Sequence, residues 1–327
     1  MKRENTGAKR VERTRAKQGA PDGLVIVDKP AGFTSHDVVA KMRGMARTRR
    51  VGHAGTLDPM ATGVLVLGIE RATKLLGHLA LTEKEYVGTI RLGQTSVTDD
   101  AEGEITASRA AHGLDRAAID AGVAELTGAI MQVPSKVSAI KIDGKRSYAR
   151  VRKGEDVEIP ARPVTVSSFV VYSAEEAEAA DGTPVTDLLV SVECSSGTYI
   201  RALARDLGEA LGVGGHLTAL RRTRVGPYKL DRARTLEQLQ TAVDDEAGGG
   251  LPVMPIGEAA AAAFPRWDVT LDQARLLTNG VRIPMPRFDE DSDGPARPAA
   301  AFAPDGTFLA LLENQGGRAK SLAVFAE

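Results

Sequence analysis

Short apolar runs separated by polar, glycine- and proline-containing segments indicate a chain of interleaved strands and helices. Residues 24–27 and 64–67 are continuously apolar, as expected of buried strands. Residues 86–92 alternate, which places Tyr86 on the inward face of a strand. Thr34 or Ser35 can cap the helix that follows the first strand. The pattern predicts strands at 24–27, 64–67, 86–92, 164–171 and 187–193, and helices at 36–47, 116–127 and 199–211.

These elements follow one another without a regular strand–helix alternation, which favours an α+β (mixed α/β) fold. Residues 1–20 have almost no large apolar side chains and seven Lys/Arg, so they predict a disordered basic arm. Near 244–263 the composition changes to acidic, glycine-rich and then alanine-rich sequence, which indicates a domain boundary. We therefore expect a large domain at 21–245 and a small module at 246–327, with a short helix at 271–278.

The formal net charge of the 327 residues is −1, but the charge is unevenly distributed. The segments 1–20, 41–50, 136–153 and 201–224 carry +5, +5, +6 and +3, so the rest of the chain carries −20. Basic residues interleaved with an aromatic, as in 136–153 with Tyr148, suit a phosphate backbone and an unstacked base, although such a run can also be a solvated surface. We expect the last three segments to converge on one RNA-facing cleft.

The numbers and spacing of cysteine and histidine limit which disulfides and metal sites the chain could form. A single cysteine, Cys194, excludes an intrachain disulfide framework and a cysteine-based zinc site. The five histidines show no paired metal-ligand spacing, so no catalytic metal is expected. No apolar run approaches the ~20 residues that span a bilayer, and no secretory signal precedes the first strand. The sequence therefore predicts a cytoplasmic protein without a membrane segment.

The densest candidate for chemistry is the segment 52–63, in which three glycines, a proline and small residues surround one carboxylate, Asp58. Such a segment forms a tight loop that lets backbone approach a ligand closely, and the following proline restricts the conformation of Asp58. The alternative is that Asp58 only initiates a turn before Pro59. No P-loop, nucleophile-elbow or complete dinucleotide-binding motif is present.

Two further side chains could act with Asp58. Arg201 lies off the apolar stripe of its helix and shares a face with Arg205. An arginine beside an active carboxylate would orient it and favour its charged form. The alternative is a solvated helix charge. Tyr86 is either a core aromatic or a platform on which a base can stack.

Six segments in order resemble the bacterial tRNA pseudouridine synthase B family. They are Gly23-Leu24-Val25-Ile26-Val27-Asp28-Lys29-Pro30, residues 52–63, Lys84-Glu85-Tyr86, Pro134-Ser135-Lys136-Val137-Ser138-Ala139, Gly197-Thr198-Tyr199-Ile200-Arg201 and His216-Leu217-Thr218-Ala219-Leu220-Arg221-Arg222. The resemblance covers about residues 23–230. It implies a pseudouridine-synthase catalytic domain with a mixed, largely antiparallel sheet, followed by a PUA-like β-rich module. It also implies that uridine in the TΨC loop of tRNA becomes pseudouridine.

The resemblance also implies site residues. The catalytic residues would be Asp58, Tyr86 and Arg201. The substrate-binding residues would be His53, Tyr199, Leu220, Lys29 and Lys74. Asp58 would act at the sugar either as nucleophile or as base, and the sequence leaves both open.

The implied isomerisation involves no redox change, group donor or net hydrolysis, so no cofactor is expected. The expected partner is the tRNA T arm, with the protein acting as a monomer. Residues 231–327 contain nine Lys/Arg and fifteen Asp/Glu, so we expect the C-terminal module to serve mostly as a structural cap. Two alternatives are a non-catalytic RNA-binding factor and an aspartyl-phosphate enzyme. The second commonly needs another Asp two positions on, where this chain has Met60.

Overall fold

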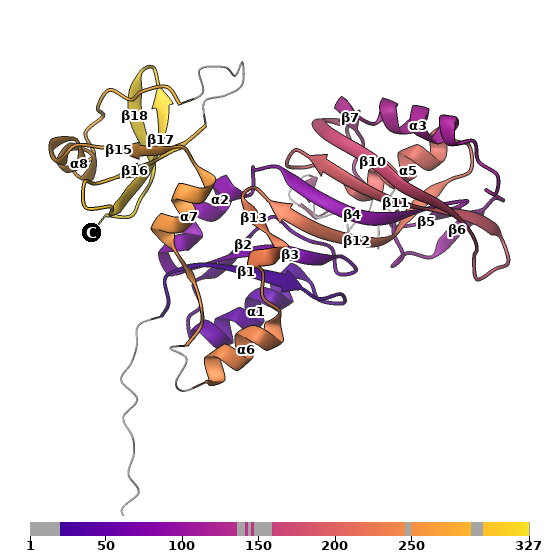
Figure 1. The fold of residues 1–327 in the computed structure, drawn as a ribbon, viewed down its shortest axis with the longest axis horizontal. Coiled ribbons are helices and arrows are strands. Elements are labelled where there is room, and N and C mark those ends of the chain that lie inside the picture. The colour runs from indigo at the N-terminus through magenta and orange to yellow at the C-terminus, as the bar shows by residue number, and fades with distance from the viewer. Residues whose placement is uncertain are drawn as a thin grey trace, which may run out of the picture.

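The computed structural model describes residues 20–135, 141–142, 145–146, 159–245, 250–288 and 297–326, which form a ten-stranded sheet, a four-stranded sheet and two two-stranded sheets, with helices packed against the two larger sheets (Figure 1). The strands of the large sheet are β1 (Gly23–Lys29), β2 (Val51–Ala54), β3 (Thr62–Ile69), β4 (Lys84–Leu92), β7 (Gly128–Gln132), β10 (Arg162–Glu178), β11 (Pro184–Cys194), β12 (Gly215–Val225), β13 (Tyr228–Lys229) and β14 (Met254–Pro255). Its order is β14-β1-β3-β12-β4-β11-β10-β7, with β13 beside β12 and β2 beside β3. Strands β3 and β12 pair in parallel, and the other pairs described in this sheet are antiparallel.

The remaining strands form smaller sheets. They are β5 (Gln94–Ser96), β6 (Ile105–Ser108), β8 (Lys141–Ile142), β9 (Lys145–Arg146), β15 (Arg266–Asp268), β16 (Ala299–Phe302), β17 (Phe308–Gln315) and β18 (Arg318–Val324). The helices are α1 (Ser35–Ala46), η1 (Glu70–Leu75), α2 (Leu76–Leu79), α3 (Arg116–Glu125), α5 (Ile200–Ala210), η2 (Leu230–Arg232), α6 (Leu236–Asp244), α7 (Ile256–Ala263) and α8 (Leu271–Thr278). The mixed, mostly antiparallel sheet and the β-rich C-terminal module are the fold that the sequence predicted.

Local sequence explains where these elements begin. Thr34 is the cap of α1, because its hydroxyl accepts from the backbone N–H of Asp37 while the Asp37 carboxylate accepts from the backbone N–H of Thr34. Strand β4 alternates buried and half-buried residues from Lys84 to Leu92, so Tyr86 faces inward as expected. The predicted strands and helices are each present in the structure, β10 and β11 being longer than expected.

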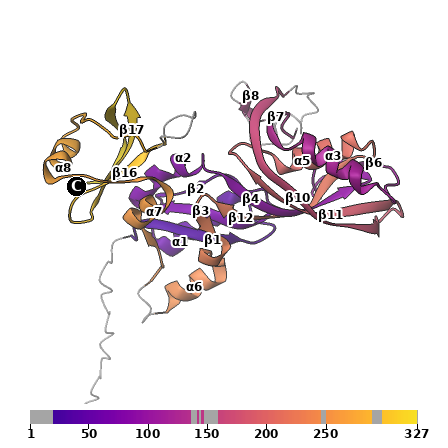
Figure 2. The ribbon, with the colours of Figure 1, turned by 45° about the horizontal axis from the view of Figure 1, so that its top comes forward.

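Three apolar cores hold the large sheet between helices (Figures 1 and 2). Helices α1 and α6 pack on one face of β1, β2 and β3. Residues of η1, α2 and α7 pack with β1, β3 and side chains of the C-terminal module in a second core. Helices α3 and α5 cover β4, β10, β11 and β12 in a third core. The junction between β3 and β12 therefore lies between two well-packed halves, and the candidate loop 52–63 leads into it.

The C-terminal module is tied to the large domain. Strand β14 pairs with the start of β1, although it follows the expected boundary. Phe302, Phe308 and Phe325 of the module share a core with Leu24 and Leu75. Division of the chain at 245/246 stays a prediction. The described part of the chain contains no helix long and apolar enough to cross a membrane.

Gly63 lies where β3 meets β12, and we predict that Gly63→Ala is strongly destabilising. Its φ is +101°, and an added Cβ would lie 2.2 Å from the carbonyl oxygen of Arg222. Because that oxygen belongs to the sheet backbone, the clash cannot be relieved by a rotamer change. We expect a loss of about 3 kcal/mol or more in the free energy of unfolding.

The matched control is Gly182→Ala, which also has positive φ (+80°) but open space around the added Cβ. That variant should cost about 1–2 kcal/mol through backbone strain alone. Urea unfolding of both variants provides the comparison. Equal losses would show that the contact between β3 and β12 is looser than described.

Candidate active site

Four residues hold the loop that carries Asp58 against the domain. The Ser35 hydroxyl donates to the carbonyl oxygen of Leu57 (3.1 Å) and accepts from its N–H (2.9 Å). The backbone N–H of Gly32 donates to the carbonyl oxygen of Pro59 (2.9 Å). Lys29 reaches the same oxygen, and Arg222 reaches the carbonyl oxygens of residues 55 and 56. The loop is therefore held firmly against the domain, and it keeps Asp58 in one position.

Arg201 links Asp58 to a second carboxylate. Its Nε lies 3.1 Å from Asp58 Oδ2 and its Nη2 lies 3.3 Å from Asp58 Oδ1, a two-pronged contact. Its Nη1 lies 3.4 Å from Asp100 Oδ2 and 3.0 Å from the carbonyl oxygen of Thr98. The side chain of Arg201 is 7% exposed and that of Asp100 3%, whereas that of Asp58 is 35% exposed. Asp58 is thus oriented by a buried arginine while its carboxylate stays accessible.

A pocket of about 280 Å³ lies beside this carboxylate. It is lined by Gly55, Thr56, Leu57, Asp58, Ala80, Lys84, Tyr86, Ser195, Ser196, Gly197, Thr198, Tyr199, Ile200, Arg201, Leu220 and Arg222. Burial is the main cause that raises the pKa of the Tyr86 phenol, with the nearby Arg222 opposing it. The side-chain amide of Gln132 brackets Tyr199, since it donates to the Tyr199 carbonyl oxygen (3.1 Å) and accepts from its N–H (2.8 Å).

The structure therefore brings five of the eight expected site residues into one pocket, namely Asp58, Tyr86, Arg201, Tyr199 and Leu220. Lys29 lies behind the loop, where its ammonium donates to the carbonyl oxygens of Pro30 (2.9 Å), Phe33 (2.6 Å) and Pro59 (3.1 Å). Its place makes it a support of the Asp58 loop.

His53 and Lys74 are not among the residues that line the pocket. The His53 ring meets His36 edge-on, with ring centroids 5.6 Å apart, and burial lowers the His53 pKa. The Lys74 ammonium donates to the carbonyl oxygen of Val324 (2.8 Å) and lies over the ring of Phe325. Lys74 thus connects η1 to the C-terminal module.

Sequence reasoning missed three residues of this site. Asp100 gave no local signal, and Arg222 stood out only as the last residue of the matching segment 216–222, because their roles depend on contacts with distant segments. Lys84 did give one, since it lies two positions before Tyr86 and therefore on the same inward face of β4. Among the described residues, no group of three or more His, Cys, Asp or Glu could hold a metal ion.

The basic segments behave differently from one another. Most of 136–153 lies outside the described residues, so its convergence on the pocket stays a prediction, and nearly all of the basic arm 1–20 lies outside them as well. In 201–224, four arginines pair with carboxylates: Arg201 with Asp58 and Asp100, Arg205 with Asp99 and Asp206, Arg221 with Asp28, and Arg224 with Glu85 and Glu193. Much of this segment's charge is therefore neutralised within the protein.

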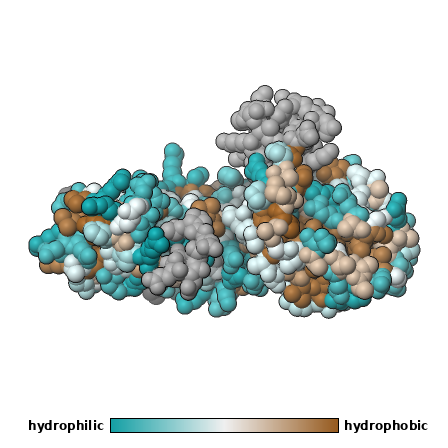
Figure 3. All heavy atoms as spheres, turned by 90° about the horizontal axis from the view of Figure 1, so that it is seen from above, coloured by the Kyte–Doolittle hydropathy of each residue, from teal (hydrophilic) through white to brown (hydrophobic). Residues whose placement is uncertain are grey.

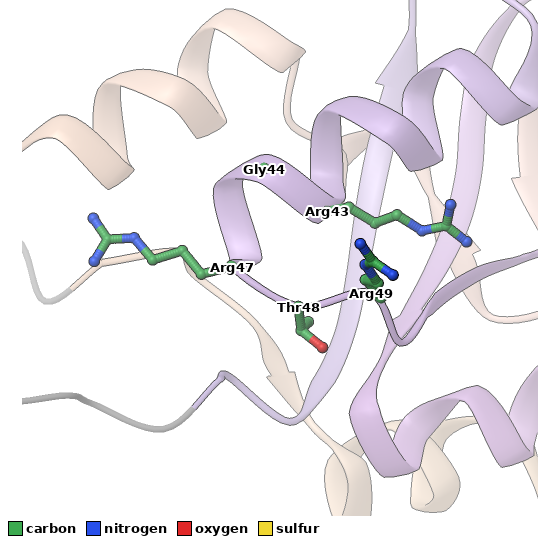
Figure 4. A pocket seen from close by; sticks show the side chains of 5 residues that line it. All are labelled: Arg43, Gly44, Arg47, Thr48 and Arg49. Carbon is green, nitrogen blue, oxygen red and sulfur yellow. The ribbon is translucent and has the colours of Figure 1, made fainter.

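The segment 41–50 lines a separate surface hollow at the end of α1. Figure 4 shows Arg47 directed away from Arg43 and Arg49, so the three guanidinium groups do not converge. This hollow shares no residue with the pocket beside Asp58. On the face shown in Figure 3, hydrophilic and hydrophobic side chains are interspersed at both ends of the molecule.

Two buried lysines near the pocket predict a rise in stability at mildly alkaline pH. Burial lowers the pKa of both Lys29 and Lys84 to about 8, with Asp58 and Glu102 opposing the shift at Lys29 and Arg222 adding to it at both. Both lysines are charged in folded and unfolded protein below pH 8. Above it the unfolded chain binds more protons than the folded protein, so stability rises with pH. Between about pH 7.5 and 9 we expect a gain on the order of 1 kcal/mol per lysine.

Urea unfolding at the two pH values measures this gain. The window ends near pH 9 because burial raises the pKa of Cys194 to about 11, so that above pH 9 the folded thiol keeps a proton that the unfolded one loses, which opposes the gain from the lysines. A Lys29→Met/Lys84→Met double variant should lose most of the slope. A steady fall in wild-type stability across the window would contradict the prediction.

Comparisons with known proteins place the chain in a family. Residues 43–200 match the TruB family pseudouridylate synthase N-terminal domain, residues 201–251 match the tRNA pseudouridylate synthase B C-terminal domain, and residues 264–326 match the tRNA pseudouridine synthase II C-terminal domain. A tRNA pseudouridine synthase B from Streptomyces griseus is 74% identical over 306 residues, covering 94% of this chain and 98% of that protein. One from Arthrobacter sp. (strain FB24) is 57% identical over 306 residues, covering 93% and 96%.

A solved structure has the same fold at lower sequence identity. The crystal structure of a Cbf5–Nop10–Gar1 complex contains a chain that superposes with a TM-score of 0.68 at 26% identity, covering 94% of this chain and 85% of that one. The matches extend over both the large sheet and the C-terminal module. The family models match in order along the chain, the fold is shared, and the sequence identity is high across nearly the whole length. The chain therefore belongs to the TruB family of pseudouridine synthases.

Proposed function

We propose that this chain isomerises uridine to pseudouridine in the TΨC loop of tRNA, at position 55. The observation that carries the proposal is the pocket in which the exposed edge of Asp58 is oriented by buried Arg201, next to the inward-facing Tyr86. The relatives that match almost the whole chain are named tRNA pseudouridine synthase B, which supports the same reaction. Binding alone would not require a carboxylate fixed in this way.

The substrate nucleotide leaves its stack and enters the pocket, at a cost of a few kcal/mol that pocket contacts offset. Tyr86 lies against the base, while Tyr199 and Leu220 line the space around it. Asp58 acts at the sugar, as nucleophile on C1′ or as base. Arg201 holds the carboxylate in one orientation through two contacts.

The reaction balances within one nucleotide. The N1–C1′ bond breaks, the base turns, a C5–C1′ bond forms, and the proton lost from C5 is matched by one gained at N1. Every atom of the substrate is in the product, and no electrons enter or leave. We propose accordingly that the isomerisation needs neither cofactor nor metal.

The partner in this proposal is the T arm of tRNA, bound by a monomer in the cytoplasm without an obligate protein partner. The acidic C-terminal module would then stabilise the large domain more than it binds RNA. Its shared core with β1 and η1 and its contact with Lys74 support that role.

The test is incubation of the protein with an unmodified tRNA transcript, followed by mapping of pseudouridine with and without a chelator. We expect one product site, in the TΨC loop, formed equally in both conditions. Product at another site would overturn the substrate assignment, and loss of product with chelator would overturn the metal-free chemistry. A non-catalytic RNA-binding protein would bind the transcript and form no product.

A further inference from the structure

Two buried cations line the pocket without a carboxylate partner in the described part of the chain. Arg222 donates to the carbonyl oxygens of Val64 (2.8 Å), Thr56 (3.3 Å) and Gly55 (3.2 Å). Lys84 donates to the carbonyl oxygens of Ala80 (2.6 Å) and Thr82 (2.5 Å). Arg222 is 1% exposed and Lys84 is 5% exposed. The neighbouring arginines 201, 205, 221 and 224 each pair with a carboxylate, so these two cations differ from the rest of their surroundings.

The two cations are also close to each other. A Cβ built on Gly55 would lie 3.8 Å from Arg222 Nη1 and 3.9 Å from Lys84 Cε. Arg222 makes the electrostatic surroundings of both Lys84 and the Tyr86 phenol more positive. Two buried like charges without an anion are unfavourable in the free protein. Such an arrangement stabilises an anion that forms in the pocket, because donors and charges already in place need no reorganisation.

The isomerisation forms an anion here. When the N1–C1′ bond breaks, its electron pair stays with the base, and the negative charge spreads over the ring nitrogen and the O2 and O4 oxygens. We propose that Lys84 and Arg222 stabilise this departing uracil anion while it turns in the pocket. The proposal rests on the proposed function. It holds whether Asp58 attacks C1′ or removes a sugar proton, because both routes release the same anion.

Lys84 has the donor capacity for this role. An ammonium carries three N–H groups, and two of them are accounted for by the carbonyl oxygens of residues 80 and 82. Its place two residues before Tyr86 on β4 puts it on the same face as the ring against which the base lies. Arg222 acts through its full charge, and it also holds the loop that precedes Asp58.

The test compares substrates whose bases depart with different ease. Transcripts carrying uridine or 5-fluorouridine at the target position are incubated with the protein under single-turnover conditions at slightly acidic pH. Breakage of the N1–C1′ bond is followed as loss of the N-nucleoside. Fluorine withdraws electrons and stabilises the departing anion without help from the protein. We expect Lys84→Met to slow cleavage of uridine about 100-fold and that of 5-fluorouridine about 10-fold or less. Lys84→Arg, which keeps the charge, should recover most of the rate on uridine.

Arg222→Met and Arg222→Lys form the second pair. We expect Arg222→Met to slow N1–C1′ cleavage more for uridine than for 5-fluorouridine, and Arg222→Lys, which keeps the charge, to recover most of the rate on uridine. Where a methionine variant does not fold, Lys84→Gln replaces it, since the amide still donates to a carbonyl while lacking the charge. The matched control is Lys229→Gln, a change at the exposed residue of β13, which should leave both rates unchanged. Equal slowing of both substrates by the Lys84 and Arg222 variants would overturn the inference and leave only a structural role. Absence of pseudouridine with the wild-type protein would instead overturn the proposed function.

Discussion

Asp58→Asn is expected to bind tRNA with near wild-type affinity and to form no measurable pseudouridine. The amide keeps the size of the carboxylate, and the loop that carries it is held by Ser35, Gly32, Lys29 and Arg222 through other atoms. What the substitution removes is the charge that acts at the sugar. Loss of a nucleophile or base of this kind lowers turnover by about 10⁴-fold or more. Single-turnover product formation and filter binding on the same transcript measure the two quantities separately.

Asp120→Asn is the matched control, because Asp120 is an exposed aspartate of α3 paired with Arg116 one turn away. It should leave binding and turnover unchanged. Retention of more than a few per cent of the wild-type rate by Asp58→Asn would contradict the role given to Asp58. Loss of binding together with activity would indicate instead that the loop had rearranged.

Arg201→Met is expected to affect both stability and turnover, because one guanidinium serves two carboxylates. Its removal leaves Asp100, 3% exposed, without its ion-pair partner. Breaking a buried pair by removing one member costs about 3–5 kcal/mol. Asp58 loses the two contacts that orient it, so turnover should fall about 100-fold or more. Arg201→Lys should retain little activity, because one ammonium cannot reproduce the planar two-pronged contact.

The double variant Arg201→Met/Asp100→Asn separates the two effects. Neutralising Asp100 removes the unpaired buried charge, so part of the lost stability should return. Activity should not return, because Asp58 still lacks its arginine. Urea unfolding and single-turnover assays provide the readouts, with Arg116→Gln, at an exposed side chain of α3, as the surface control. Recovery of turnover in the double variant would show that Arg201 acts only by supporting the fold.

Local patterns predicted a large part of this structure. The alternation over 86–92 predicted that Tyr86 faces inward, and the glycines and proline of 52–63 predicted a tight loop around Asp58. Such features depend on backbone periodicity and on the restricted conformations of a few residue types, which neighbouring residues determine. The surroundings of the charges in the segment 201–224 could not be predicted in this way. Four of its five arginines pair with carboxylates inside the protein, and no local pattern shows this.

The sequence by itself determined the order of the strands and helices along the chain, the loop of Asp58 and the family to which the chain belongs. Only the tertiary structure decided which charges meet. Arg201 and Asp58 are 143 residues apart, and their contact depends on the pairing of β12 with β3 and on the packing of α5 against the sheet. The fold also buries Arg222 and Lys84, whose hydrogen bonds go to carbonyl oxygens and which have no carboxylate partner among the described residues. The reason is physical: periodicity is a property of adjacent residues, whereas an electrostatic environment is the sum over segments that only the fold brings together.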